Sequence, residues 1–278
     1  MKVKDFRREL SKRFSECDGI DIFLILSDVL KIEKTAVLLG MHEVSFDEER
    51  EIIEKVSRLA EGEPVSYILG EREFMSLPFY VKKGVLIPRQ DTEVLVETLI
   101  SKLDRERALN VIDMCTGSGC IGISLAYYMD NINLSMCDIS DVALEVSEKN
   151  AKRHIRNRDY KVFKIDLLKD FPEDRYDCIV SNPPYIKTDV IEGLEKKVKD
   201  FEPSIALDGG DDGLIFYRRI AKEAKLNDGG ILAFEIGFDQ GKEVSDILVN
   251  LGYKDVSVIK DIENRDRVVL GFKGCFEE

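Results

Sequence analysis

The chain has 278 residues, of which 44% are hydrophobic, and its formal net charge is −13. This length is suited to one large and one small domain, and the hydrophobic content is sufficient for a core. A chain this acidic lacks the broad cationic surface of a protein that binds nucleic acid non-specifically, so we expect no stable nucleic-acid partner.

Apolar residues recur at helical spacing through the first 70 or so positions. The apolar faces are Val3, Phe6, Leu10 and Phe14; Ile22 to Leu30; Ala36 to Leu39; and Ile52 to Leu59. Ser45 and Glu48 have the spacing of a capping box before the last of these. Together these patterns predict a small helical domain over residues 1–73.

Short extended runs replace the helical pattern from Phe74 onward. They flank Lys82-Lys83-Gly84, which predicts a β-hairpin connector over residues 74–90. A helix should follow, with Asp91 or Thr92 as its side-chain cap. The large domain would then cover residues 91–278.

Strand and helix signals alternate beyond Leu109. The expected strands are 109–113, 132–137, 161–165, 176–181 and 230–236, and the expected helices are 120–129, 141–153, 213–225 and 240–250. Such alternation predicts a Rossmann-like α/β fold, with a mostly parallel sheet covered on both faces. The last runs, 256–259 and 267–272, are too close for a crossover helix and should form an antiparallel hairpin at the sheet edge.

A glycine-rich loop follows the first strand of this sheet. Gly117, Gly119 and Gly122 satisfy G-x-G-x-x-G, and Asp138 ends the next strand, so a dinucleotide is one possible ligand. The alternative is S-adenosylmethionine, which brings an ammonium and a sulfonium where a dinucleotide brings an anionic pyrophosphate. Asp113, at the end of the first strand, should repel the anion and attract the cations. Asp138 suits either ligand, because both carry a ribose diol.

Further candidate residues follow the next two strands. Asp166 and Leu167 occupy the place where an adenine ring would lie, and Asn182-Pro183-Pro184-Tyr185 follows the strand 176–181. The prolines remove two backbone donors, so this segment is stiff and rich in acceptors, with Tyr185 as a flat face beside them. It suits a planar group that bears an NH2, whose two hydrogens require two acceptors.

These motifs resemble those of the peptide chain release factor glutamine methyltransferases of the HemK/PrmC type, which are S-adenosylmethionine-dependent enzymes. The matching stretches are 63–70, 72–74, 86–93, 113–119, 181–185 and 201–203. The resemblance implies methylation of the side-chain amide nitrogen, N5, of the glutamine in the Gly-Gly-Gln motif of class I release factors. It also implies that the helical domain binds the release factor.

The resemblance also assigns roles to individual residues. It places Cys115, Thr116, Gly117, Ser118, Gly119, Asp138, Leu167 and Asn182 at S-adenosyl-L-methionine, which would leave as S-adenosyl-L-homocysteine, and Asn182, Pro183, Pro184 and Tyr185 at the glutamine. Two positions depart from the family pattern: Cys115 replaces a glycine and Gln90 replaces a proline. Cys115 should limit how closely the backbone approaches the methionine part of the cofactor.

The expected mechanism is positional, with Asn182, Pro183 and Tyr185 as the catalytic residues. The Asn182 side-chain oxygen and the Pro183 carbonyl would accept the two amide hydrogens while Tyr185 packs on the amide plane. Fixing that geometry can lower the barrier by on the order of 7 kcal/mol. Arg89, Glu202 and Glu235 are interpreted as structural ion-pairing residues and are left out of the site.

Two other functions fit part of the pattern. An amino-methyltransferase of adenine or cytosine requires the same acceptors and stacking face, although the acidic charge argues against it. A non-catalytic cofactor-binding module that docks on translation proteins is the second.

The remaining features concern cysteines and location. The six cysteines, at 17, 115, 120, 137, 178 and 275, form no C-x-x-C pair, and His42 and His154 are far apart, so we expect no metal site. Several cysteines lie in apolar runs, which is typical of free buried thiols. With no apolar stretch of membrane-spanning length, we expect a cytoplasmic monomer without a membrane partner.

Overall fold

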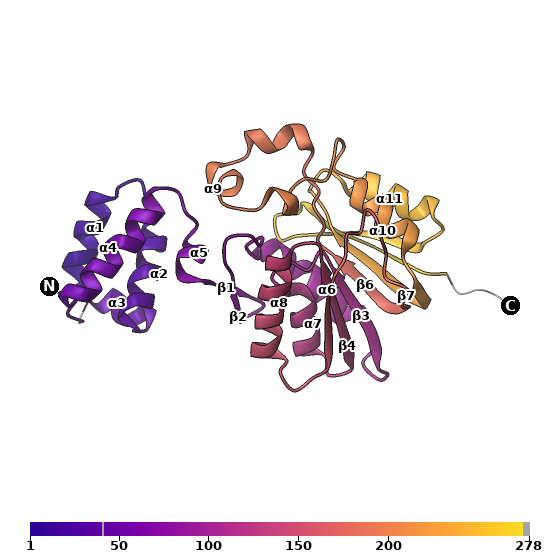
Figure 1. Ribbon diagram of the computed structural model, residues 1–278, viewed down its shortest axis with the longest axis horizontal. Helices are drawn as coiled ribbons and strands as arrows, with labels where there is room; N and C mark the ends of the chain where they lie inside the picture. The colour runs from indigo at the N-terminus through magenta and orange to yellow at the C-terminus, as the bar shows by residue number, and fades with distance from the viewer. Residues whose placement is uncertain (41, 275–278) are drawn as a thin grey trace. The chain divides into compact units, whose positions relative to one another are not determined.

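The structure, a computed structural model, describes residues 1–40 and 42–274, in which the chain forms two compact units (Figure 1). Unit 1 comprises Met1–Glu71 and Glu195–Phe201, and unit 2 comprises Arg72–Leu194 and the residues from Glu202 onward. Unit 1 therefore takes in a short segment from the middle of the second half of the chain. No helix among the described residues is long and apolar enough to cross a membrane. Cys275 lies outside the described residues.

Unit 1 is helical and encloses its own apolar core. Its helices are α1 (Val3–Arg13), α2 (Gly19–Leu30), α3 (Lys34–Leu39), α4 (Phe46–Ala60), α5 (Val65–Leu69) and, from the later segment, α9 (Lys196–Lys199). Phe6, Ile25 and Ile52 are fully or almost fully buried in this core, which confirms the predicted apolar faces. The capping box is also confirmed: Ser45 Oγ accepts from the Glu48 N–H, and Glu48 Oε2 accepts from the Ser45 N–H at 2.8 Å.

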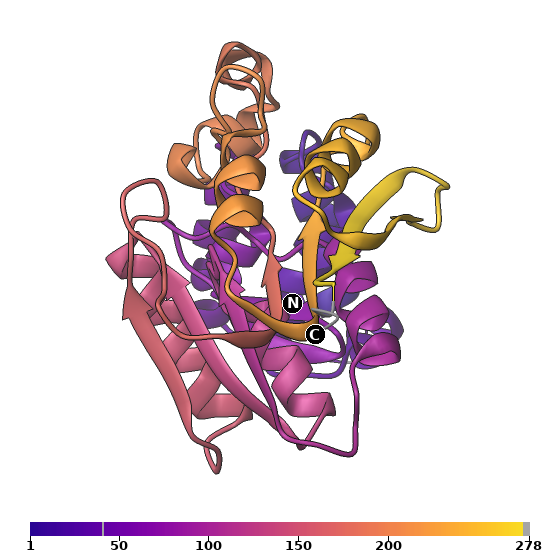
Figure 2. The same ribbon diagram turned by 90° about the vertical axis from the view of Figure 1, so that its right-hand side faces the viewer.

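Unit 2 is built on a seven-stranded sheet in the order β5-β4-β3-β6-β7-β9-β8. The strands are β3 (Leu109–Met114), β4 (Ile132–Asp138), β5 (Tyr160–Lys164), β6 (Tyr176–Ser181), β7 (Leu226–Glu235), β8 (Lys254–Lys260) and β9 (Asp266–Phe272). The first five are parallel, whereas β9 is antiparallel to both β7 and β8. Figure 2 shows β8 and β9, in yellow, on the opposite side of the sheet from β5. The predicted fold class and the edge hairpin are confirmed.

Successive residues of each central strand enter different cores, one on each face of the sheet. Val111 and Val180 pack in one core, and their neighbours Ile112 and Ile179 pack in the other. The first core includes residues of α6 (Glu93–Lys102), α7 (Cys120–Tyr128) and α8 (Asp141–His154), and the second includes residues of α10 (Ile215–Glu223) and α11 (Gly241–Asn250). This double coverage is visible in Figure 1, and it leaves the carboxyl edge of the sheet for loops.

The predicted connector hairpin is misplaced in sequence. Strands β1 (Glu71–Phe74) and β2 (Leu77–Tyr80) form a two-stranded sheet whose turn is Met75-Ser76, not Lys82-Lys83-Gly84. Both turn residues have positive φ, 49° and 56°, as a tight two-residue hairpin turn requires. Because neither is glycine or asparagine, the usual signal of such a turn is missing from the sequence.

Candidate active site

The carboxyl ends of the parallel strands surround a cavity of about 450 Å³, and all of its lining residues belong to unit 2. Of the predicted site residues, the cavity is lined by Cys115, Gly117, Asp138, Leu167, Asn182 and Pro184. Thr116, Ser118, Gly119, Pro183 and Tyr185 are not among its lining residues. The sheet thus brings together residues that are distant in sequence, as expected for the carboxyl edge of an open α/β sheet.

The loop after β3 owes its shape to three residues with left-handed backbone. Cys115, Gly117 and Gly119 have φ values of 57°, 55° and 80°. At Gly117 a Cβ atom would meet nothing within 4 Å, so the main chain is open on that side. At Gly119 a Cβ atom would lie 2.6 Å from the Ile123 side chain, so glycine permits close packing at the start of α7. Cys115 thus adopts a conformation that favours glycine, the residue expected there from the sequence resemblance.

Asp113 does not face the cavity, contrary to the role expected for it. Its carboxylate is completely buried, and Oδ2 accepts hydrogen bonds from Thr116 Oγ1 at 2.7 Å and from the Gly122 N–H at 3.0 Å. A Cβ atom on Gly122 would lie 2.9 Å from Asp113 Cβ, which explains the third glycine of the motif as a packing requirement. Burial raises the pKa of Asp113 to about 7. Asp113 therefore shapes the loop and does not contact a ligand in the cavity directly.

Asp138 and Asp166 present carboxylates to the cavity from the ends of β4 and β5. Asp138 Oδ2 accepts from the Gly117 N–H at 3.0 Å and Oδ1 from the Ser140 N–H at 2.9 Å, so each oxygen keeps a lone pair for a ligand. Burial raises the pKa of Asp138. In contrast, an ion pair with Lys169 at 2.8 Å lowers the pKa of Asp166.

The segment after β6 is held rigidly through its backbone. Gln240 Nε2 donates to the Tyr185 carbonyl at 3.0 Å. Gly209 and Gly213 also approach this residue so closely that a Cβ atom on either would lie 2.7 Å or less from Tyr185 backbone atoms. The Tyr185 ring packs against the second core, and burial raises its pKa. Asn182 is the partly exposed polar side chain of this segment on the cavity wall.

Residues 89–93 contact three other parts of unit 2: Glu202, Arg267 and Met75. Arg89 Nη2 lies 2.7 Å from both carboxylate oxygens of the buried Glu202, which confirms a structural ion-pairing role for both residues. Arg267 Nη2 lies 3.1 Å from Asp91 Oδ2. Glu93 Oε1 accepts from the Met75 N–H at 2.8 Å and fixes the β1–β2 turn.

Two expectations about this region are wrong. Thr92 makes no side-chain cap on α6, because a 3₁₀ turn (Gln90–Thr92) precedes the helix and the Thr92 hydroxyl interacts with Glu235 instead. Glu235 is not in an ion pair among the described residues: it is the last residue of β7, only 2% exposed, and its Oε2 atom is buried without a hydrogen-bond partner. Its position beside Asn182 was not recognised from sequence.

A further wall of the cavity was also missed. It comes from two irregular stretches, Gly84 to Leu86 and Pro203 to Ala206, and from Ile215 and Phe216 at the start of α10, a helix that was expected but not assigned to the site. The sequence offered no pattern to connect these stretches with the strand ends, since their proximity arises only from the fold of unit 2.

Comparisons with known proteins agree with this architecture. The methyltransferase small domain matches residues 89–196, and the PrmC N-terminal domain matches residues 3–70. A release factor glutamine methyltransferase of Clostridium botulinum is 44% identical over 91% of this chain and 92% of its own length. The chain belongs to the release factor glutamine methyltransferase family. A second member, from Thermodesulfovibrio yellowstonii, is 36% identical over 97% of this chain and 98% of its own.

Membership of the release factor glutamine methyltransferase family confirms the resemblance found in the sequence motifs. A methyltransferase from Pyrococcus furiosus shares the fold, with a TM-score of 0.53 and 18% identity over 80% of this chain and 99% of its own. The protein is thus a methyltransferase, which rules out the non-catalytic interpretation and the dinucleotide interpretation of Gly117, Gly119 and Gly122.

Proposed function

We propose that the protein methylates the N5 amide nitrogen of the glutamine in the Gly-Gly-Gln motif of class I release factors. The observation that carries the proposal is the Asn182-Pro183-Pro184 segment, with Asn182 and Pro184 on the cavity wall, in a chain 44% identical to a release factor glutamine methyltransferase. The segment offers acceptors and few donors, which matches a carboxamide NH2.

The cavity has the features that S-adenosyl-L-methionine requires. The open main chain at Gly117 allows close approach, the Asp138 carboxylate can accept from a ribose diol, and Leu167 gives an apolar surface for the adenine ring. With these we assign Cys115, Thr116, Ser118, Gly119 and Asn182 to the same cofactor site. When bound, S-adenosyl-L-methionine supplies the methyl group, activated by the positive sulfonium, and S-adenosyl-L-homocysteine is the product.

The protein's contribution to the reaction is orientation. Asn182 Oδ1 and the Pro183 carbonyl each accept one hydrogen of the glutamine amide, and Pro184 and Tyr185 complete the substrate site. With both hydrogens held, the glutamine carboxamide can neither rotate nor turn its oxygen, in place of its nitrogen, toward the cofactor. An amide nitrogen is a poor nucleophile, so its alignment and the exclusion of water are what the site has to provide.

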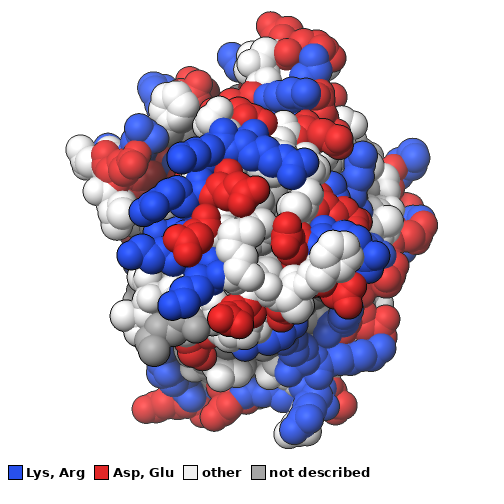
Figure 3. Space-filling view, turned by 90° about the vertical axis from the view of Figure 1, so that its left-hand side faces the viewer, with Lys and Arg blue, Asp and Glu red and all other residues white. Residues whose placement is uncertain are grey.

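Methylation of nucleic acid bases remains the alternative that an experiment must separate from this proposal. One face of the molecule, shown in Figure 3, carries Lys and Arg side chains interspersed with Asp and Glu. This mixture of charges favours a protein substrate over a polyanion. We further propose that the protein acts in the cytoplasm as a monomer, without a membrane partner.

The test is a methyl-transfer assay with tritiated S-adenosyl-L-methionine and three acceptors: a class I release factor, bulk DNA and bulk RNA. Label should appear on the release factor, at its Gly-Gly-Gln glutamine. Asn182→Ala should lower kcat about 100-fold or more, because it removes one of the two acceptors. Asn133→Ala, at an exposed asparagine of β4, is the matched control and should keep full turnover. Label on nucleic acid, or near-normal turnover of folded Asn182→Ala, would refute the proposal.

A further inference from the structure

Glu235 and Asn182 are neighbours at the carboxyl edge of the sheet. Ser181, the last residue of β6, pairs with Phe234 of β7 in parallel register, so Asn182, directly after β6, lies beside Glu235, the last residue of β7, and the two side chains share a hydrogen bond. In-register residues of parallel strands direct their side chains to the same face. The Asn182 side chain therefore lies between the cavity, which it lines, and the enclosed carboxylate of Glu235.

Glu235 is buried, with polar and titratable groups around it. Burial raises its pKa to about 7, while hydrogen bonding by Thr92, the positive charge of Arg267 and hydrogen bonding by Asn182 act in the opposite direction. The titratable groups facing it from the elements around it are Asp91 before α6, Arg267 on β9, Tyr217 on α10, Cys120 on α7, and Tyr185. Arg267 makes its ion pairs with Asp91 and Asp261 and not with Glu235.

An enclosed carboxylate without an ion-pair partner is costly, and an amide or apolar side chain of the same size would be cheaper if only packing mattered. The carboxylate differs from an amide because it has no hydrogen-bond donor when ionised. When ionised it can only accept hydrogen bonds, so the Asn182 carboxamide must turn its NH2 toward it. The Asn182 oxygen is then left for the cavity.

We propose that Glu235 is a positioning residue, which orients the Asn182 carboxamide so that its oxygen faces the substrate amide. A glutamine at this position can donate as well as accept, so it stabilises both orientations of the Asn182 carboxamide. In the reversed orientation, an NH2 group would face the NH2 of the substrate, and neither could accept from the other. The inference rests on the proposed function, because it gives Asn182 Oδ1 the task of accepting from the glutamine.

Glu235→Gln preserves size and is the decisive variant. We expect it to keep its affinity for S-adenosyl-L-methionine within about threefold and the KM for the release factor nearly unchanged, while kcat falls about 30-fold or more. Glu235→Gln combined with Asn182→Ala should be no slower than Asn182→Ala alone, since Glu235 acts through Asn182. A multiplied loss in the double variant would overturn the inference.

The pH profile gives a readout that a purely structural role would not change. Glu235 positions Asn182 in its ionised form. The kcat of the wild type should therefore have its full value above the Glu235 pKa of about 7 and decline below it. Glu235→Gln should lack this decline. Asp113 also has a pKa of about 7, but it is present in both proteins, so its titration cannot explain a difference between their profiles. Thr92→Val removes a group that lowers the pKa of Glu235, so the decline should shift to higher pH.

Asp177→Asn is the control for stability, because it changes a buried acid to an amide at the opposite edge of the same sheet. It should lower the stability without lowering kcat at 25 °C. If Glu235→Gln does not fold, the Thr92→Val profile decides: no shift would refute the inference. If wild-type protein leaves the Gly-Gly-Gln glutamine unlabelled, the proposed function fails. If wild type labels it and Glu235→Gln does so equally fast, only the present inference fails.

Discussion

Cys115 lines the cavity with a backbone conformation that favours glycine. Its φ of 57° is left-handed, a conformation that costs a residue with a Cβ atom roughly 1–2 kcal/mol. The side chain lines the cavity and packs against the second core. The loop therefore has a backbone conformation that glycine adopts without strain, and Cys115 is strained in it.

This strain can be measured with a pair of variants. Cys115→Gly and Cys115→Ala both remove the thiol, but only glycine relieves the left-handed backbone. We expect Cys115→Gly to be more stable than Cys115→Ala by about 1 kcal/mol, measured as the free energy of unfolding in urea. The comparison cancels the loss of the sulfur contacts. Glycine also leaves the unfolded chain more freedom than alanine does, so a Cys115→Ala variant more stable than Cys115→Gly would show that the conformation at position 115 carries no strain.

Some site residues were predictable from sequence and others were not, for a physical reason. Asp138, Leu167 and Asn182 follow strands that periodicity identifies, and the carboxyl ends of parallel strands meet, so their place on one cavity was predictable. The orientation of a side chain was not. Asp113, the second-last residue of β3, and Glu235, the last of β7, also lie at strand ends, yet both are buried, because the packing of neighbouring elements decides which side of a strand end is open.

At the level of elements, the periodic segments were predicted well and the irregular ones were not. The strands and helices of the sheet lie within a few residues of their expected positions because they alternate between two apolar cores. The turn at Met75-Ser76 and the segment from Thr188 to Ala206 had no such pattern. Their conformations depend on contacts such as Glu93 with Met75 and Arg89 with Glu202, which connect distant parts of the sequence.

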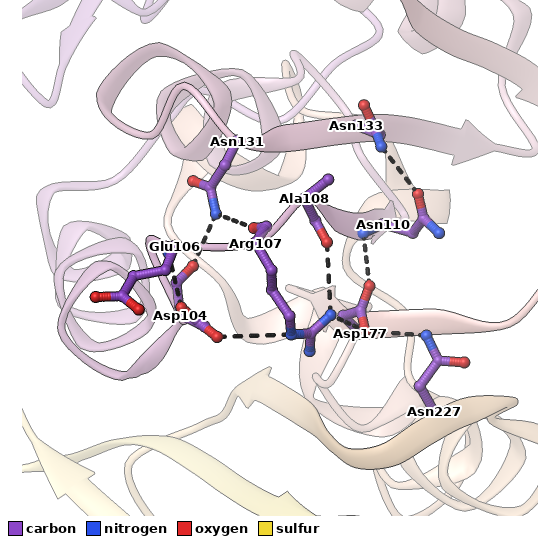
Figure 4. Close-up of polar contacts among 9 residues, drawn as sticks. All are labelled: Asp104, Glu106, Arg107, Ala108, Asn110, Asn131, Asn133, Asp177 and Asn227. Atoms are coloured by element: carbon purple, nitrogen blue, oxygen red, sulfur yellow. Dashed lines mark hydrogen bonds and ion pairs between the residues drawn. The ribbon is translucent and has the colours of Figure 1, made fainter.

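The amino edge of the sheet has its own polar network, centred on Asp177 (Figure 4). The carboxylate accepts from Arg107 Nη1 at 2.9 Å, the Asn110 N–H at 2.8 Å and Asn227 Nδ2 at 2.9 Å. It thereby joins the starts of β3, β6 and β7. Burial alone would raise the pKa of Asp177, but the three donors outweigh it and the pKa is lowered.

A lowered pKa makes this network sensitive to acid. Ionised Asp177 stabilises the fold above the unfolded-state pKa of about 3.9, and that contribution is lost as the pH falls through the lower folded-state value. Asp177→Asn should cost about 2 kcal/mol at pH 7, and the difference from wild type should shrink below about pH 4. Urea unfolding of both proteins from pH 3 to 7 measures this difference. A difference independent of pH would show that the charge of Asp177 is not what stabilises the edge.

At the level of the whole molecule, the two units are not consecutive pieces of chain. The predicted boundary at residue 73 lies close to Glu71, but no sequence pattern indicated that Glu195–Phe201 belongs to unit 1. Within that unit, Lys197 Nζ lies 4.0 Å from Asp21 Oδ2, and a Cβ atom on Gly62 would lie 3.7 Å from the Phe201 ring. A segment of the methyltransferase half of the sequence therefore depends on helical-unit contacts for its order.

This dependence can be tested by limited proteolysis, since Lys196, Lys197 and Lys199 of α9 are trypsin sites. Phe201→Ala removes a half-buried ring, which contributes less than the roughly 3–5 kcal/mol of a core phenylalanine. A loss of about 1.4 kcal/mol raises the open population about tenfold, so cleavage in α9 should accelerate by about that factor.

The matched control is Phe238→Ala, because Phe238 belongs to unit 2 and is 65% exposed. The rate of cleavage in α9 should equal that of the wild type, since an exposed ring contributes little packing energy. The cavity is lined entirely by unit 2, so Phe201→Ala should also bind S-adenosyl-L-methionine with unchanged affinity. If α9 is cut equally fast in Phe201→Ala and wild type, packing of Phe201 in unit 1 does not order the segment, and its order must come from the residues on either side.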